Sequence, residues 1–233
     1  MSKYTCLLID LDGTLLDFEK AEKSSLEKTF HRFSLPVSEE NYEKYYEINK
    51  ALWRAFERGE IEKEKLVVKR FKDLLAYLNC DGNAEEINTF YLTELSKCGD
   101  AYEGALEFLE KIMQNYTIAI ATNGVSRTQQ GRVKASNLSR FIDFLITSED
   151  ANAAKPEIAF FTYAMEIIGQ EEKESVLMIG DSLLADIQGG INFGIDTCWY
   201  NPEKLLPPND INPTYTAVNY TELLHFIESG GIE

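Results

Sequence analysis

Three aspartates are placed where they could act together on a metal ion. Asp10 and Asp12 follow the apolar run 7–9, and Asp181 follows a second apolar run at 176–179. Buried carboxylates need a protein partner or a bound cation, because water no longer solvates their charge. Neither histidine nor cysteine accompanies these three, so they form an all-oxygen site that suits Mg²⁺ rather than zinc.

A threonine and a lysine supply the groups that a phosphoryl group needs on its other oxygens. Thr122 and Asn123 end the apolar run 117–121, and Lys155 stands at the start of a later helical segment. Their hydroxyl, backbone amides and ammonium suit phosphoryl oxygens. With a carboxylate as the nucleophile, this set of residues describes phosphoryl transfer.

These residues follow segments that we expect to be strands of one parallel sheet. Apolar segments alternate with helical ones, which indicates an α/β fold with a Rossmann-like parallel sheet covered on both faces. The carboxyl ends of such strands share one edge, where ligands bind. The predicted strands are residues 4–10, 117–121, 144–147, 176–179 and 197–200, with helices at 105–113, 126–136, 156–168, 183–192 and 221–228.

Between the first two strands lies a long helical block without any strand signal. Apolar residues recur there at three- and four-residue spacing, which predicts four helices joined by short loops. They are expected near residues 17–31, 38–58, 67–78 and 84–97. We therefore predict an α/β core made of residues 1–16 and 99–233, with residues 17–98 inserted as a four-helix cap.

Charge and composition limit the kinds of partner. The chain of 233 residues has a formal net charge of −16, from 39 acidic and 23 basic residues, so its surface repels a nucleic-acid polymer. No apolar run reaches the ~18 residues of a membrane span. Four cysteines form no CxxC pair, which argues against a zinc site. The N-terminus has no signal-peptide pattern, and we expect a cytoplasmic monomer or homodimer that binds no membrane.

Four short motifs resemble those of the haloacid dehalogenase superfamily, in the same order and at strand ends. They are Asp10-Leu11-Asp12-Gly13-Thr14, Thr122-Asn123-Gly124, Lys155-Pro156, and Gly180-Asp181-Ser182 with Asp186. The resemblance covers nearly the whole chain, and the helical block stands where that family has its α-helical cap. It implies a hydrolase that acts on small-molecule phosphate esters.

The resemblance also implies a role for each motif residue. Asp10 would attack phosphorus and carry an aspartyl-phosphate intermediate. Asp12 would protonate the leaving oxygen and later take a proton from water, so it must hold a proton when the substrate binds. Thr122 and Lys155 would hold the phosphoryl oxygens, with Asn123 helping through its backbone.

The cofactor implied by the same resemblance is Mg²⁺. The carboxylates of Asp10 and Asp181 and the backbone carbonyl of Asp12 would bind it. Asp186 would lie behind these ligands and orient Lys155 or a water, although it could instead be a solvated helix residue. Family members that cleave carbon–halogen bonds lack the second aspartate, because a halide needs no proton, so Asp12 favours a phosphatase.

The motifs leave the substrate open. The run from Thr122 through Gln130 and Arg132, together with residues 189–192 and 198–202, resembles the bacterial pyrimidine 5′-nucleotidase subgroup. This implies a phosphatase of nucleoside 5′-monophosphates. The alternatives are a sugar-phosphate or phosphoglycolate phosphatase, a sugar-phosphate mutase, and a non-catalytic binding protein, in which we would expect a motif residue to be missing.

The predicted cap offers two aromatic residues that could contact a substrate. Tyr46 and Trp53 lie seven residues apart on one helix and could stack on a nucleobase. Such residues more often pack the helical bundle. Arg54 and Arg58 on the same helix are expected to be solvated partners of neighbouring glutamates.

Overall fold

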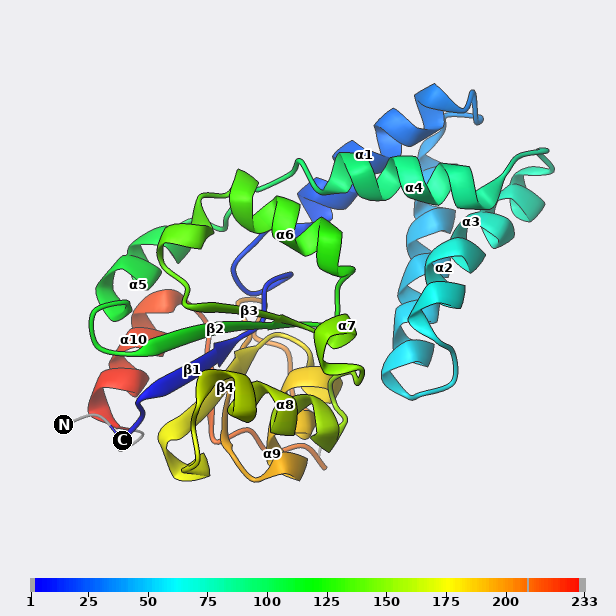
Figure 1. The fold of residues 1–233 in the computed structure, drawn as a ribbon. Helices are drawn as coiled ribbons and strands as arrows, with labels where there is room; N and C mark the ends of the chain where they lie inside the picture. The colour runs from blue at the N-terminus through cyan, green and yellow to red at the C-terminus, as the bar shows by residue number, and fades with distance from the viewer. Residues whose placement is uncertain (1–2, 209, 231–233) are drawn as a thin grey trace. The chain divides into compact units, whose positions relative to one another are not determined.

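The protein is a parallel α/β structure, as predicted. The computed structural model describes residues 3–208 and 210–230. The described residues form one sheet in the order β3-β2-β1-β4-β5-β6, and every neighbouring pair is parallel (Figure 1). The strands are β1 (Cys6–Ile9), β2 (Thr117–Thr122), β3 (Phe144–Thr147), β4 (Val176–Gly180), β5 (Asp196–Tyr200) and β6 (Tyr215–Ala217).

Helices cover both faces of the sheet, because its strands are apolar on both sides. Side chains alternate along a strand, so Leu7 and Ile9 of β1 join one core and Cys6 and Leu8 join the other. The first core lies under α5 (Ala105–Ile112), α6 (Ser126–Ala135) and α10 (Tyr220–Ser229). The second lies under α8 (Ile158–Ile168) and α9 (Gly189–Phe193), on the opposite face in Figure 1.

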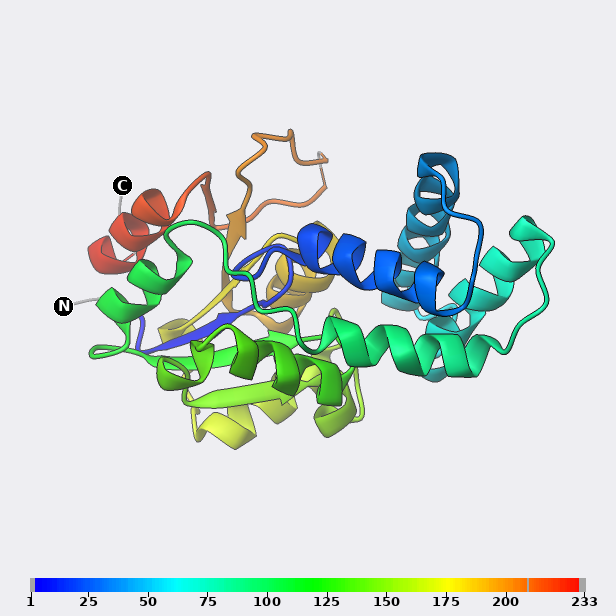
Figure 2. The same cartoon turned by 90° about the horizontal axis from the view of Figure 1, so that it is seen from above.

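The helices and strands of the α/β core differ from the sequence prediction in three places. Strand β6 and the short helix α7 (Ser148–Ala151) were not predicted. The predicted helix 183–192 is divided into a π-helical turn, η3 (Leu183–Gln188), followed by α9. Between β5 and β6, the described residues of the proline-rich segment contain no helix or strand and form the orange loop of Figure 2.

The inserted helices form a compact unit of their own, Glu19–Cys98, separate from the unit that holds the sheet. They are α1 (Phe18–Arg32), α2 (Glu39–Glu57), α3 (Lys63–Leu78) and α4 (Ala84–Leu95). Buried rings of Tyr45, Phe71 and Tyr91 hold the last three helices together, with centroids 5.3 to 5.8 Å apart. No helix in the described ranges is long and apolar enough to cross a membrane.

Candidate active site

The predicted site residues gather at the carboxyl ends of β1 and β4 in the middle of the sheet. The strand order changes direction here, since β2 and β3 lie on one side of β1 and β4 to β6 on the other. Open α/β sheets bind their ligands at such a switch point. Asp10 follows β1 and Asp181 follows β4. The backbone N–H of Asp10 donates to the carbonyl of Ile179 at 2.8 Å, so strand pairing places Asp10 beside the end of β4.

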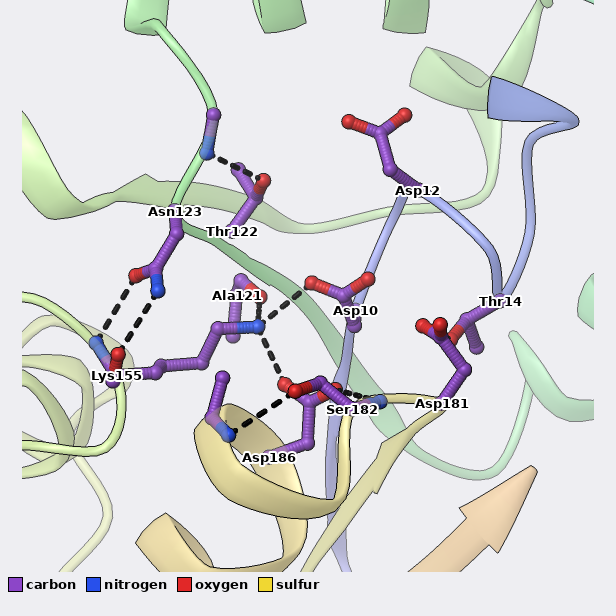
Figure 3. A network of polar contacts seen from close by, with 12 residues as sticks. Asp10, Asp12, Thr14, Ala121, Thr122, Asn123, Lys155, Asp181, Ser182 and Asp186 are labelled. Atoms are coloured by element: carbon purple, nitrogen blue, oxygen red, sulfur yellow. Dashed lines mark hydrogen bonds and ion pairs between the residues drawn. The ribbon is translucent and has the colours of Figure 1, made fainter. Parts of the chain in front are cut away.

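Lys155 is the cation at the centre of this network (Figure 3). Its Nζ lies 2.6 Å from Asp10 Oδ1, 2.6 Å from Asp186 Oδ1 and 2.5 Å from the carbonyl oxygen of Ala121. An ammonium has three protons, and these three oxygens use them all. Burial opposes the charge on Lys155, but Asp10 and Asp186 outweigh burial and raise its pKa. Lys155 is therefore a fixed cation between two carboxylates.

Asp10, Asp181 and Asp186 form an acidic cluster. One carboxylate oxygen of each lies within 4.8 Å of those of the other two. Burial raises the pKa of Asp10 well above its ordinary value; Lys155 opposes this, and the other two carboxylates add to it. Three carboxylates face a single ammonium, so the negative charge of the cluster exceeds the positive charge beside it. A divalent cation with a preference for oxygen ligands would supply that charge, and the donor set fits Mg²⁺.

Asp181 is held where the chain turns after β1. Thr14 Oγ1 donates to Asp181 Oδ1 at 3.1 Å. Gly13 has φ +85°, and a Cβ at this position would lie 2.6 Å from Asp181 Oδ2, so only glycine leaves room for the carboxylate. The residue as a whole is exposed, but its carboxylate lies against the Gly13 backbone. This desolvation and the nearby Asp186 raise the pKa of Asp181 to about 7, against the hydrogen bond from Thr14.

Asp186 is a buried member of the network rather than a solvated helix residue. It is 1% exposed, and its Oδ2 accepts from the backbone N–H of Ser182 at 3.0 Å. The π-helical turn η3 carries it back under the end of β4. A Cβ on Gly180 would lie 2.1 Å from Asp186 Oδ2, so the last residue of the strand makes space for it.

Asn123 orients the segment that carries Lys155. Its side-chain Nδ2 donates to the Lys155 carbonyl at 2.8 Å, and its Oδ1 accepts from the Lys155 N–H at 2.9 Å. Both of these hydrogen bonds go to the backbone of Lys155, so Asn123 ties the second motif to the third. The Lys155–Pro156 peptide bond in this segment is cis.

Asp12 lies apart from the acidic cluster. In Figure 3 its carboxylate points away from Lys155, whereas the carboxylate of Asp10 points toward it. Its Oδ1 accepts from Arg132 Nη2 at 2.9 Å, and its Oδ2 accepts from Gln129 Nε2 at 2.7 Å. Gln129 Nε2 also donates to Thr122 Oγ1 at 2.9 Å. Helix α6 therefore holds both Asp12 and Thr122.

Sequence reasoning did not give Gln129 a role, and it did not identify Arg132 as the partner of Asp12. Both are buried, at 2% and 0% exposure, next to the buried Val133. Residues three apart lie on the same side of a helix. The sequence signal for them was weak, because α6 is mostly polar and Val133 is its only buried apolar residue.

The aromatic residues singled out in the helical unit make contacts within that unit. Tyr46 and Trp53 are half-buried on α2. The ring of Trp53 lies edge-on to Phe56 at 5.6 Å, and that of Tyr46 lies 6.0 Å from the ring of Tyr45. Stacking on a nucleobase stays a prediction.

The chain is similar to a hydrolase family and to several of its members over nearly its whole length. A family model described as haloacid dehalogenase-like hydrolase matches residues 7–200. The chain is 37% identical to the HAD-hydrolase YfnB of Bacillus subtilis over 227 residues, or 97% of each chain. It is 36% identical to the pyrimidine 5′-nucleotidase PynA of Streptococcus pneumoniae over 231 residues, which cover 99% of this chain and 98% of that protein.

A third relative and a solved structure extend this likeness. The pyrimidine 5′-nucleotidase YjjG of Escherichia coli is 33% identical over 221 residues, or 95% of this chain and 96% of YjjG. A crystal structure of Bacillus subtilis YfnB bound to magnesium matches with a TM-score of 0.91. The match covers 96% of this chain and 98% of YfnB.

Proposed function

Since this chain belongs to the haloacid dehalogenase-like hydrolases, we propose that it is a phosphomonoesterase that uses Asp10 as its nucleophile. One observation carries the proposal. The Asp10 carboxylate stands at the tip of the central strand, 2.6 Å from the Lys155 ammonium and within an acidic cluster that needs a cation. An anionic nucleophile can approach an anionic phosphate ester only where positive charge offsets both.

In the first step, a carboxylate oxygen of Asp10 attacks phosphorus. The new bond joins Asp10 to the phosphoryl group, while the bond from phosphorus to the ester oxygen breaks. Asp12 gives its proton to that oxygen, so that an alcohol leaves rather than an alkoxide. Arg132 and Gln129 hold Asp12 on the side of α6 through hydrogen bonds to its two oxygens.

In the second step, water attacks the phosphorus of the aspartyl phosphate. Asp12, now a carboxylate, takes a proton from the water as the new oxygen–phosphorus bond forms. The bond to Asp10 breaks, which returns the Asp10 carboxylate and releases inorganic phosphate.

The phosphoryl oxygens have donors on the side of β2. The Thr122 hydroxyl and the backbone of Asn123 would bind them. Lys155 adds positive charge, although its three protons now go to Asp10, Asp186 and Ala121. Its contribution to a phosphoryl oxygen would require one of these bonds to be shared.

Mg²⁺ is the proposed cofactor, held by the carboxylates of Asp10 and Asp181 and the backbone carbonyl of Asp12. When bound, it neutralises charge on the phosphoryl group and on the carboxylates. The charge deficit of the acidic cluster and the magnesium bound in YfnB support this proposal.

We further propose nucleoside 5′-monophosphates as the substrates and the helical unit Glu19–Cys98 as the cap that selects them. The names of PynA and YjjG, both pyrimidine 5′-nucleotidases, support this class. The helical unit carries the half-buried Tyr46 and Trp53, whose rings are suited to a flat base.

Phosphate release from a panel of small esters tests the proposal. The panel contains nucleoside 5′-monophosphates, sugar phosphates and phosphoglycolate, each with Mg²⁺. We expect release from all reactive esters to require Asp10, and the highest kcat/KM with pyrimidine nucleotides. Preference for a sugar phosphate would contradict the substrate class, and isomer formation without phosphate release would point to a mutase.

A further inference from the structure

The hydroxyl of Thr122 has both of its acceptor positions filled. The backbone N–H of Gly124 donates to Thr122 Oγ1 at 3.1 Å, and Gln129 Nε2 donates to it at 2.9 Å. A hydroxyl oxygen has two lone pairs and one proton. Within the described ranges the structure gives this proton no acceptor. The Thr122 hydroxyl is therefore set to donate to a bound ligand.

Gln129 fixes this arrangement because the same amide nitrogen contacts both Thr122 and Asp12. The second proton of Nε2 goes to Asp12 Oδ2 at 2.7 Å. The amide nitrogen of Gln129, not its oxygen, thus faces both Asp12 and Thr122. Gln129 is 2% exposed, and a Cβ on Gly124 would lie 2.2 Å from its Nε2. The glycine of the second motif thus makes room for this side chain.

We propose that Gln129 is a positioning residue of the phosphatase site. With one nitrogen it turns the hydroxyl proton of Thr122 toward the phosphoryl oxygens of the substrate and holds the carboxylate of Asp12. The inference rests on the proposed function, because the acceptor of the Thr122 proton is taken to be a phosphoryl group. If Gln129 only supported α6, its replacement would change stability without changing the strength of anion binding.

Calorimetric titration of the Mg²⁺-loaded protein with inorganic phosphate tests this role without any turnover. Gln129→Met keeps the length of the side chain and removes its donors. We expect it to weaken phosphate binding about fivefold, because the Thr122 proton is no longer directed. Gln130→Met is the matched control, since Gln130 is the exposed neighbour on α6. It should bind phosphate as the unaltered protein does.

A double variant shows whether Gln129 acts through Thr122. Thr122→Val should weaken phosphate binding by itself, and adding Gln129→Met should weaken it less than twofold further. The proposal would be overturned if the loss of phosphate affinity in the double variant equalled the product of the losses in the two single variants. Unchanged phosphate binding by Gln129→Met would overturn it as well.

Gln129→Glu provides a second route if the methionine variant fails to fold. The new carboxylate would accept the Thr122 proton and repel Asp12, so phosphate should bind more weakly than in the unaltered protein by more than fivefold. Binding equal to that of the unaltered protein would contradict the role of Gln129. Failure of the unaltered protein both to bind phosphate and to release it from any ester would instead refute the proposed function.

Discussion

Arg132 and Asp12 form an ion pair at 2.9 Å in which only the arginine is fully buried. The guanidinium has two further nitrogens, Nε and Nη1, that lack hydrogen-bond partners in the described part of the chain. Asp12 is the anion that compensates this buried charge. A neutral Asp12 would not compensate the charge of Arg132, so this ion pair and the proposed proton transfer compete for the same carboxylate.

Removal of Asp12 should destabilise the protein by leaving Arg132 unpaired. We expect Asp12→Ala to lower the free energy of unfolding by about 2 kcal/mol, less than for a fully buried pair because Asp12 reaches solvent. Adding Arg132→Met should restore at least half of the loss. Urea unfolding of the two single variants and the double variant measures this coupling. An Asp12→Ala protein that unfolds at the same urea concentration as the original would contradict it.

Replacement of the nucleophile should stop turnover without loss of fold. Asp10→Asn cannot form an aspartyl phosphate, so kcat should fall at least about a thousandfold. The variant should also fold well, because it removes one of three crowded carboxylates and Lys155 keeps Asp186 as its partner. Phosphate release and the circular dichroism spectrum give the two readouts. Residual activity within tenfold of the original would exclude the covalent route.

Mg²⁺ should stabilise the protein more at pH 8 than at pH 6. Without a cation the pKa of Asp181 is raised to about 7, so below this pH a proton occupies the carboxylate and must leave before the metal binds. The same raised pKa means that the contribution of Asp181 to the stability of the metal-free protein is present at low pH and is lost as the pH rises through 7.

Thermal unfolding with Mg²⁺ and with EDTA at the two pH values measures this difference. The shift in Tm caused by Mg²⁺ should be larger at pH 8. Asp181→Asn is the control, and it should abolish both the shift and its dependence on pH. Equal shifts of the original protein at pH 6 and pH 8 would disprove the competition between proton and metal.

Thiol labelling should separate the cysteines by burial. Cys6 and Cys198 lie in strands and are buried, and burial raises the pKa of the Cys6 thiol to about 12. Cys98 is also buried, whereas Cys80 is only partly so. A thiol reagent at pH 8 should therefore modify Cys80 first. Cys80→Ser should remove the fast phase, and a fast phase that persists in this variant would show that a buried cysteine is accessible.

The strands that carry the site could be predicted because each is a continuous apolar run that ends in a polar residue. β1, β2 and β4 follow this pattern, and it placed Asp10, Thr122 and Asp181 on one edge. Strand β6 was missed because only three residues, Tyr215–Ala217, pair with β5, and they follow shortly after a proline. So short a run has no periodicity of its own.

The sequence alone could not predict which way the polar side chains of the site point. Gln129 lies on a helix that is mostly polar, so the pattern alone does not tell which of its polar residues face the sheet. That depends on how α6 packs over β2, which is a tertiary property. Likewise the sequence predicted Lys155 in the site, but not that three protein oxygens already use its protons.

The position of β1 has a consequence for how the chain folds during synthesis. Among the described strands this one is made first, but its two neighbours in the sheet come from residues 117–120 and 176–179. The helical unit, in contrast, is a single stretch from Glu19 to Cys98 that can form as soon as it has emerged. Contacts between distant segments form slowly. Asp10, the proposed nucleophile, therefore follows a strand that cannot pair with β2 until residues 117–120 have been made, whereas the helices next to it in sequence can form before that.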